Sequence, residues 1–156
     1  RASGGRLELR PERLVVGDLL ERVRARHTAR VLSAGRVLDA APAGSLELLG
    51  DGLRLEQALG NLVENAVVHG RGPIRLRAER VDGVVELHVS DAGDGIAPEL
   101  GDAAFHAFTK ADRARSVGGA GLGLAIVDAI ARAHGGSVHT DRSDAGADVW
   151  IAVPQR

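Results

Sequence analysis

Glycines are concentrated in the stretch GGAGLGLAIV, residues 118–127, which runs directly into an apolar segment. Glycines just before a helix commonly bring backbone N–H groups close to a phosphate. A dinucleotide fingerprint starting at Gly119 or Gly121 needs glycine at its sixth position, where Leu124 or Ile126 stands. The Gly-Lys-Ser/Thr run of a P-loop does not occur in the chain. The stretch therefore indicates either a different kind of phosphate site or a flexible linker before a helix.

Two asparagines lie four residues apart in the stretch NLVENAVVH. On a helix, Asn61 and Asn65 would project from one face, one turn apart, while Leu62 and Ala66 face the core. An amide carbonyl oxygen is a suitable ligand for Mg²⁺, and an amide NH₂ group can donate to phosphate oxygens. A solvated polar stripe on an amphipathic helix is the open alternative.

A carboxylate follows a predicted strand in the stretch VSDAGDGIAP. The strand ends at Ser90, Asp91 comes next, and Gly93 and Gly95 would let the backbone pass close to a ligand. A carboxylate held at a strand end can accept a hydrogen bond from an exocyclic amine such as that of adenine. An ordinary turn between two elements remains the alternative interpretation.

Apolar periodicity and turn residues predict the elements that must position these side chains. Mixed strands and helices with antiparallel hairpins predict an α+β fold in two layers. From residue 93 to residue 120 regular structure is weak, which is typical of a functional or mobile loop. In order, we expect a strand at 6–9, a helix capped by Asp18 and ending near Ala34, strands at 36–40 and 45–49, a helix capped by Asp51 and ending at Val68, a hairpin at 74–93 around Asp82-Gly83, a helix at 122–133, and strands at 136–140 and 147–153.

Composition limits the class of protein. The 156 residues fit one domain, and with 44% hydrophobic but only 2% aromatic residues the core must be aliphatic. A net charge of −1 argues against a dedicated nucleic-acid binder. There is no cysteine for a disulfide, no signal peptide, and no apolar run near the roughly 20 residues of a membrane span. The chain starts at Arg1 without methionine, so we expect a fragment of a longer protein.

In order and spacing, these stretches resemble the ATP-binding catalytic domain of bacterial sensor histidine kinases, in the superfamily shared with gyrase, heat-shock chaperone ATPases and mismatch-repair ATPases. NLVENAVVH resembles the N box, DAGDGIAP the first glycine box, FHAF the F box and GAGLGLAIV the second glycine box. GADVWIAVP is similar to the closing strand, so the resemblance extends from about Leu7 to Pro154. It implies the two-layer α/β sandwich called the Bergerat fold, with a mixed five-stranded sheet on three helices and a mobile ATP lid at about 101–120. Residues 1–156 would form a single ATP-binding catalytic domain.

The resemblance also implies roles for individual residues. Asn65 would coordinate the Mg²⁺ that bridges the ATP phosphates, with Asn61 beside it, and both would be catalytic. Asp91 would accept the adenine amine, and His69 would reach a phosphate. The other nucleotide contacts would come from the two glycine boxes and the lid, at Gly93, Gly95, Ile96, Lys110, Gly119, Gly121, Leu122, Gly123 and Leu124.

The fate of the γ-phosphate is indicated by Asn61. Hydrolysing members of the superfamily place a glutamate at this position, where it can activate water, and an amide is a poor general base. This favours transfer to a protein group, which in sensor kinases is a histidine on a separate dimerisation domain. None of the six histidines is followed by the H-box pattern of a phosphoacceptor. We therefore expect the chain to bind Mg-ATP without autophosphorylating alone.

The resemblance further implies a cytoplasmic location, a parent that can be a membrane sensor, and two partners, the histidine-bearing dimerisation domain and a response regulator. It implies no nucleic acid and no membrane contact by this chain.

Departures from the family pattern keep two alternatives open. Val68 stands where a basic residue usually contacts phosphate, so Lys110 or Arg113 would have to replace it, and Ala107 replaces a common basic residue of the F box. A degenerate, nucleotide-insensitive regulatory module is one alternative. A serine-kinase anti-sigma factor of the same superfamily is the other.

Three side chains outside the boxes also carry expectations. His27 and His88 are expected to be surface histidines on a helix and a strand. Trp150 is expected on the outer face of the sheet, either exposed or in contact with a neighbouring domain.

Overall fold

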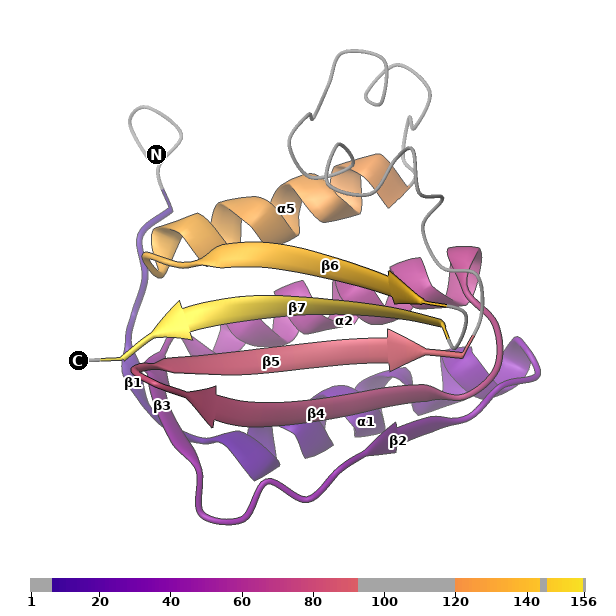
Figure 1. Cartoon of the computed structure of the whole chain (residues 1–156), viewed down its shortest axis with the longest axis horizontal. Helices are drawn as coiled ribbons and strands as arrows, with labels where there is room; N and C mark the ends of the chain where they lie inside the picture. Colours follow the sequence, from indigo (N-terminus) through magenta and orange to yellow (C-terminus); the bar gives the residue numbers. More distant parts are fainter. Residues whose placement is uncertain (1–6, 93–119, 144–145, 156) are drawn as a thin grey trace.

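The computed structural model describes residues 7–92, 120–143 and 146–155. The F box and the expected lid, up to residue 119, lie outside the described residues. Elements are labelled as in Figure 1. In chain order they are β1 (Glu12–Val15), α1 (Val16–Ser33), β2 (Leu38–Ala40), β3 (Glu47–Gly50), α2 (Gly52–His69), β4 (Ile74–Val81), β5 (Val84–Asp91), α5 (Ala120–Ala133), β6 (Ser137–Ser143) and β7 (Gly146–Pro154).

The five-stranded sheet has the strand order β2-β4-β5-β7-β6. It is mixed, because β2 runs parallel to β4 while the other neighbours are antiparallel. The short strands β1 and β3 form a separate antiparallel pair. Helices α1, α2 and α5 cover one face of the larger sheet (Figure 1). This confirms the expected α+β sandwich of a mixed five-stranded sheet and three helices.

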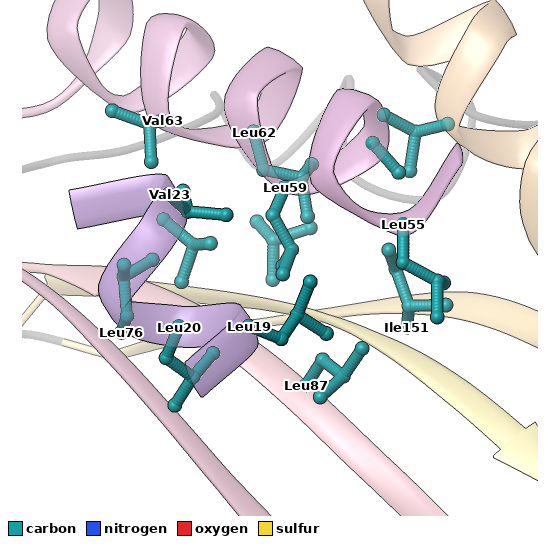
Figure 2. Packing of buried hydrophobic residues seen from close by; sticks show 14 of the residues in the cluster. Leu19, Leu20, Val23, Leu55, Leu59, Leu62, Val63, Leu76, Leu87 and Ile151 are labelled. Carbon is teal, nitrogen blue, oxygen red and sulfur yellow. The ribbon is translucent and has the colours of Figure 1, made fainter. Parts of the chain in front are cut away.

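The core between the two layers is aliphatic, as the composition requires. Leu55, Leu59 and Leu62 recur at helical spacing on α2 and are buried. They face Leu87 and Ile151, which alternate inward along β5 and β7 (Figure 2). Each buried leucine or isoleucine of this kind contributes about 1.5–3 kcal/mol to folding.

The start of α2 is capped by Asp51, as expected from the sequence. Its Oδ1 accepts a hydrogen bond from the N–H of Arg54 at 3.1 Å, and its Oδ2 accepts one from the N–H of Arg10 at 2.8 Å. The N–H of Asp51 donates to Nε2 of His134 at 3.0 Å, which ties this end of α2 to the end of α5. Burial opposes ionisation of Asp51, but the two N–H donors outweigh it and lower the pKa of the carboxyl.

Most expected bounds shift by a few residues in the structure, and three of the shifts are informative. The first strand is Glu12–Val15 rather than 6–9. The N–H of Arg10 donates to Asp51 and Pro11 has no N–H, so neither residue can donate a hydrogen bond to a neighbouring strand. Helix α1 begins at Val16 after an N-cap at Val15, so Asp18 lies in its first turn and is no cap. Helix α5 begins at Ala120, which puts Gly121 and Gly123 of the second glycine box inside its first turn.

The expectation that His88 lies at the surface is wrong, because only 3% of this residue is exposed. It lies on the face of the sheet away from the helices, but Trp150 stacks on its ring with 4.9 Å between centroids. Burial would lower the pKa of His88, yet hydrogen bonds to Asp148 and Glu86 outweigh it and raise that pKa. His27 is half buried and lies against Gly60. Trp150 lies on the outer face as expected, since its neighbours in β7 are buried in the core.

Within the described residues, no helix combines the length and apolar character that crossing a bilayer requires.

Replacing Asp51 with alanine removes the acceptor of two N–H groups, so we expect the free energy of unfolding to fall by about 1–2 kcal/mol near neutral pH. Because folding lowers the pKa of this carboxyl from its ordinary 3.8, the stabilisation is complete above that value and is lost as the pH falls through the lowered pKa. Urea unfolding near neutral pH and at about pH 2 should therefore show the gap between wild type and Asp51→Ala closing in acid.

The matched control is Asp18→Ala, since Asp18 makes no capping bond and should cost only about 0.5 kcal/mol through the helix dipole. Equal losses from the two variants would contradict the capping role.

Candidate functional site

A narrow pocket opens between the C-terminal half of α2, the end of β5 and the start of β7. It brings together Asn65, His69 and Asp91, three of the residues selected from the sequence. The first two lie one turn apart on α2, and Asp91 is the last residue of β5. The other lining residues are Leu62, Ala66, Gly70, Val89, Ala147 and Val149.

Asn65 is buried, with 6% of the residue exposed. Its Oδ1 has no hydrogen-bond partner within the described part of the chain. An unsatisfied buried acceptor costs about 1–3 kcal/mol, so this oxygen is suited to a ligand or an ion. An amide oxygen of this kind fits Mg²⁺, which prefers oxygen ligands. The alternative of a solvated polar stripe is therefore wrong for Asn65.

The surroundings of Asp91 depend on two glycines that the motif analysis did not select. A Cβ added at Gly70 would overlap Oδ2 of Asp91, and one added at Gly146 would overlap its backbone carbonyl oxygen. Gly146 also has φ +135°, a conformation that other residues rarely adopt. In sequence, Gly70 indicated only the end of a helix and Gly146 only a turn. Their close approach to Asp91 is a consequence of the fold.

Asn61 is separated from this pocket and lies against α5. Its Nδ2 donates a long hydrogen bond of 3.4 Å to the carbonyl oxygen of Gly123. A Cβ on Gly123 would lie 3.9 Å from Cβ of Asn61, so the two helices are close at this point. Asn61 therefore positions the first turn of α5 beside α2, although it shares a helix with Asn65.

The described candidates of the second glycine box lie in the first turns of α5. Gly121, Leu122 and Gly123 belong to this helix. Leu124 is 4% exposed and its side chain is part of the hydrophobic core. The other candidate contacts lie outside the described residues, namely Gly93, Gly95, Ile96, Lys110 and Gly119.

Two residues at the end of α2 differ in their position relative to the pocket. His69 lines the pocket as the last residue of the helix. Val68 is 58% exposed and supplies no positive charge there. The basic residue common in the sequence pattern therefore has no counterpart at this position.

A larger groove of about 1030 Å³ lies at the opposite end of α2. Leu9, Leu53 and Gln57 help to line it, and none of the candidate residues does. Of the three carboxylates that line it, Glu8, Glu12 and Asp51, only Asp51 is buried, and it already accepts two backbone hydrogen bonds as the helix cap. The smaller pocket, with an unsatisfied amide oxygen, a histidine and a carboxylate, is therefore the stronger candidate.

Comparison with known proteins shows which family the chain belongs to. Residues 50–156 match the family model described as histidine kinase-, DNA gyrase B-, and HSP90-like ATPase. Sensor histidine kinase component HK1 of Mycobacterium tuberculosis (strain ATCC 25618 / H37Rv) is 43% identical over 101 residues, which cover 64% of this chain and 60% of HK1. The chain thus spans less than two thirds of the length of this relative.

Solved structures resemble the chain over nearly its whole length. Full-length ShkA in complex with AMPPNP is 34% identical with a TM-score of 0.79, covering 95% of this chain and 32% of ShkA. The mycobacterial sensor histidine kinase MprB is 28% identical with a TM-score of 0.73, covering 93% of this chain and 97% of that structure. Since the family model matches more than half of the chain and includes the N box and both glycine boxes, the chain belongs to the histidine kinase-, DNA gyrase B- and HSP90-like ATPase family.

Proposed function

We propose that residues 1–156 form the ATP-binding catalytic domain of a sensor histidine kinase, which binds Mg-ATP and donates the γ-phosphoryl group to a histidine on a separate dimerisation domain. The observation that carries this proposal is the single pocket lined by Asn65, His69 and Asp91. The family membership and the likeness to sensor histidine kinases support it.

Each of the three residues of the pocket binds a different part of Mg-ATP. Asn65 holds Mg²⁺ through its unsatisfied Oδ1, and the ion supplies positive charge against the phosphates. Asp91 accepts a hydrogen bond from the adenine amine, and its position is set by close packing against Gly70 and Gly146. His69 donates to a phosphate oxygen from the end of α2. The glycine boxes and the lid supply the remaining contacts, at Gly93, Gly95, Ile96, Lys110, Gly119, Gly121, Leu122, Gly123 and the main chain of Leu124.

Phosphoryl transfer, rather than hydrolysis, follows from the chemistry of Asn61. Its amide cannot take a proton from water, and its NH₂ group donates to Gly123 of α5. The reaction then depends on positioning the nucleotide and neutralising its charge.

The acceptor is on another domain, because none of the six histidines is followed by the H-box pattern, and two of them are also engaged inside the fold. His88 is buried, and both ring nitrogens of His134 are engaged by the backbone.

The domain works as part of a larger signalling protein. The parent protein carries the histidine-bearing dimerisation domain and passes the phosphoryl group to a response regulator. The catalytic domain acts in the cytoplasm, where ATP is available, even if its parent is a membrane sensor. Neither nucleic acid nor the membrane is a partner of this domain.

Titration of a fluorescent ATP analogue, with and without Mg²⁺, tests nucleotide binding. Wild type should bind saturably, and more tightly with Mg²⁺. Asp91→Asn should weaken binding at least roughly tenfold by removing a charge-assisted hydrogen bond, and Asn65→Ala should abolish the advantage given by Mg²⁺. Asp141→Asn, an exposed position on β6, is the matched control and should bind as wild type does.

If a chain that melts cooperatively shows no saturable binding, the chain is a nucleotide-insensitive regulatory module. The exposed Val68 would then be the first position to replace with lysine.

Gly70→Ala tests whether close packing positions Asp91. The new methyl group would overlap the Asp91 carboxylate and force it to move, so we expect affinity for the ATP analogue to fall roughly tenfold, about the value of one hydrogen bond. Gly17→Ala is the matched control, because its φ is not positive and its new Cβ would lie 3.9 Å from Cβ of Ala43, an ordinary contact. Both variants should melt cooperatively by circular dichroism. Unchanged affinity in Gly70→Ala would separate Asp91 from nucleotide binding.

Phosphotransfer is tested in the full parent protein with ATP labelled at the γ-phosphate. We expect an acid-labile, base-stable phosphohistidine on the dimerisation domain, and we expect Asn65→Ala to suppress its formation. The isolated chain should incorporate no label. An acid-stable phosphoserine on a partner would instead identify a serine kinase of the same superfamily, and rapid release of free phosphate would identify a hydrolase.

A further inference from the structure

The face of the sheet away from the helices carries a compact group of charged side chains. We call it the open-face cluster, and it consists of Arg77 and Glu79 on β4, Glu86 and His88 on β5, and Asp148 on β7. In the β4–β5 ladder Arg77 is paired with His88, and Glu79 is paired with Glu86. The cluster therefore lies on the opposite face of the sheet from the pocket that contains Asn65.

His88 is at the centre of the cluster, with 4% of its side chain exposed. Its Nδ1 lies 2.9 Å from Oδ1 of Asp148, and its Nε2 lies 2.9 Å from Oε1 of Glu86. A neutral imidazole has a proton on only one of its two nitrogens. A neutral ring can therefore donate to only one of the two carboxylates. The other contact requires a positive charge between the ring nitrogen and the carboxylate oxygen, which is supplied by either a second proton or a metal ion.

The charges around His88 also call for a cation. Glu79 and Glu86 are directly opposite each other on neighbouring strands, where like charges are destabilising. Arg77 is the one guanidinium in the cluster, and its Nη2 donates to Oδ2 of Asp148 at 3.1 Å. Its Nη1 is 3.8 Å from Oε2 of Glu79, a weak contact. Three carboxylates against one guanidinium leave two negative charges in excess when the imidazole is neutral, which is the charge that a divalent ion would balance.

The donor atoms are close enough to share one ion. A carboxylate oxygen of Glu79, one of Glu86 and a ring nitrogen of His88 lie within 4.8 Å of one another. Ligands of a tetrahedral zinc ion lie roughly 3.4 Å apart. The Glu79 oxygen must therefore approach by at most roughly 1.4 Å, while Nε2 of His88 and Oε1 of Glu86, now 2.9 Å apart, must separate slightly. The side chain of Glu79 is 51% exposed and free to rotate toward the other two. Three protein ligands of the N/O type leave a fourth position for water.

Asp148 completes the arrangement from the other side of the ring. Nδ1 of His88 lies 2.9 Å from Oδ1 of Asp148 and 3.2 Å from Nη2 of Arg77. When the ring proton is on Nδ1 and is donated to Asp148, the Nε2 lone pair points toward Glu86. A carboxylate behind a histidine ligand is the usual way in which proteins orient the ring and raise its basicity. We propose that Glu79, Glu86 and His88 form a binding site for a divalent transition-metal ion of the zinc type, with Asp148 orienting the imidazole. When the ion binds a protonated His88, the proton of Nε2 is released to solvent.

Zinc titration of the whole chain without nucleotide tests the site. Isothermal calorimetry should give one Zn²⁺ per chain. Trp150 is the only tryptophan of the sequence and stacks on His88, so its emission should change over the same range. Glu86→Gln and Glu79→Gln should each weaken binding at least roughly tenfold, and Asp148→Asn roughly 10–100-fold.

His139→Gln is the matched control, because His139 stacks on the same tryptophan but its Nε2 is paired with Ser137. It should leave zinc affinity unchanged. Glu79 lies at an exposed position, so Glu79→Gln keeps the test valid even if the variants nearer the buried imidazole fail to fold.

Three results would overturn the proposal. The first is no saturable zinc binding by the folded chain, which would mean that a proton on His88 and the charge of Arg77 satisfy the cluster. The second is zinc binding that survives both glutamate substitutions. The third is zinc binding that His139→Gln abolishes, which would locate the metal on the other side of the tryptophan.

Discussion

The apolar side of α2 packs against the inner face of the five-stranded sheet, where Leu55, Leu59 and Leu62 are buried against side chains of β5 and β7. Most of the described functional features follow from this contact. The orientation of α2 about its own axis places Asn65 at the edge of the buried face, beside the end of β5. A rotation that exposed Asn65 would also expose the leucines, at a cost of about 1.5–3 kcal/mol for each.

The position of α2 along its axis is set by hydrogen bonds at its N-terminus. Asp51 caps the helix and binds the N–H of Arg10, while its own N–H donates to His134 at the end of α5. His134 in turn contacts the carbonyl oxygen of Ile130 through Nδ1 at 2.8 Å, which identifies the neutral tautomer with Nδ1 as donor and Nε2 as acceptor. At the other side, Asn61 contacts Gly123 in the first turn of α5. The two helices are therefore tied at both ends of their contact.

The two faces of the sheet have different chemistry because side chains alternate along each strand. Inward residues of β4, β5 and β7 form the core, while the outward residues include a buried histidine, its carboxylates and Trp150. The inner face thus positions the candidate pocket through packing. The outer face has a charged cluster whose contacts do not involve that pocket, so changes at one face need not disturb the other.

Local sequence patterns were sufficient for much of the fold. The period of the apolar residues indicated the central helix and the β4–β5 hairpin, and Asp51 was identifiable as a cap because it precedes that period. Predicted strand and helix boundaries were wrong where a long-range hydrogen bond determines them. An example is Arg10, whose N–H donates to a residue 41 positions away. The order of the N box and the two glycine boxes indicated the family, and the match to the family model confirmed it.

Spacing along one helix determined that Asn61 and Asn65 share a side of α2, because that depends only on 3.6 residues per turn. Only the tertiary structure decided that Asn65 is buried with an unsatisfied oxygen while Asn61 contacts α5. The same holds for His88, which local pattern assigned to the surface and which Trp150, Asp148 and Glu86 enclose. Burial and pairing depend on residues from other strands and helices, and no local pattern contains them.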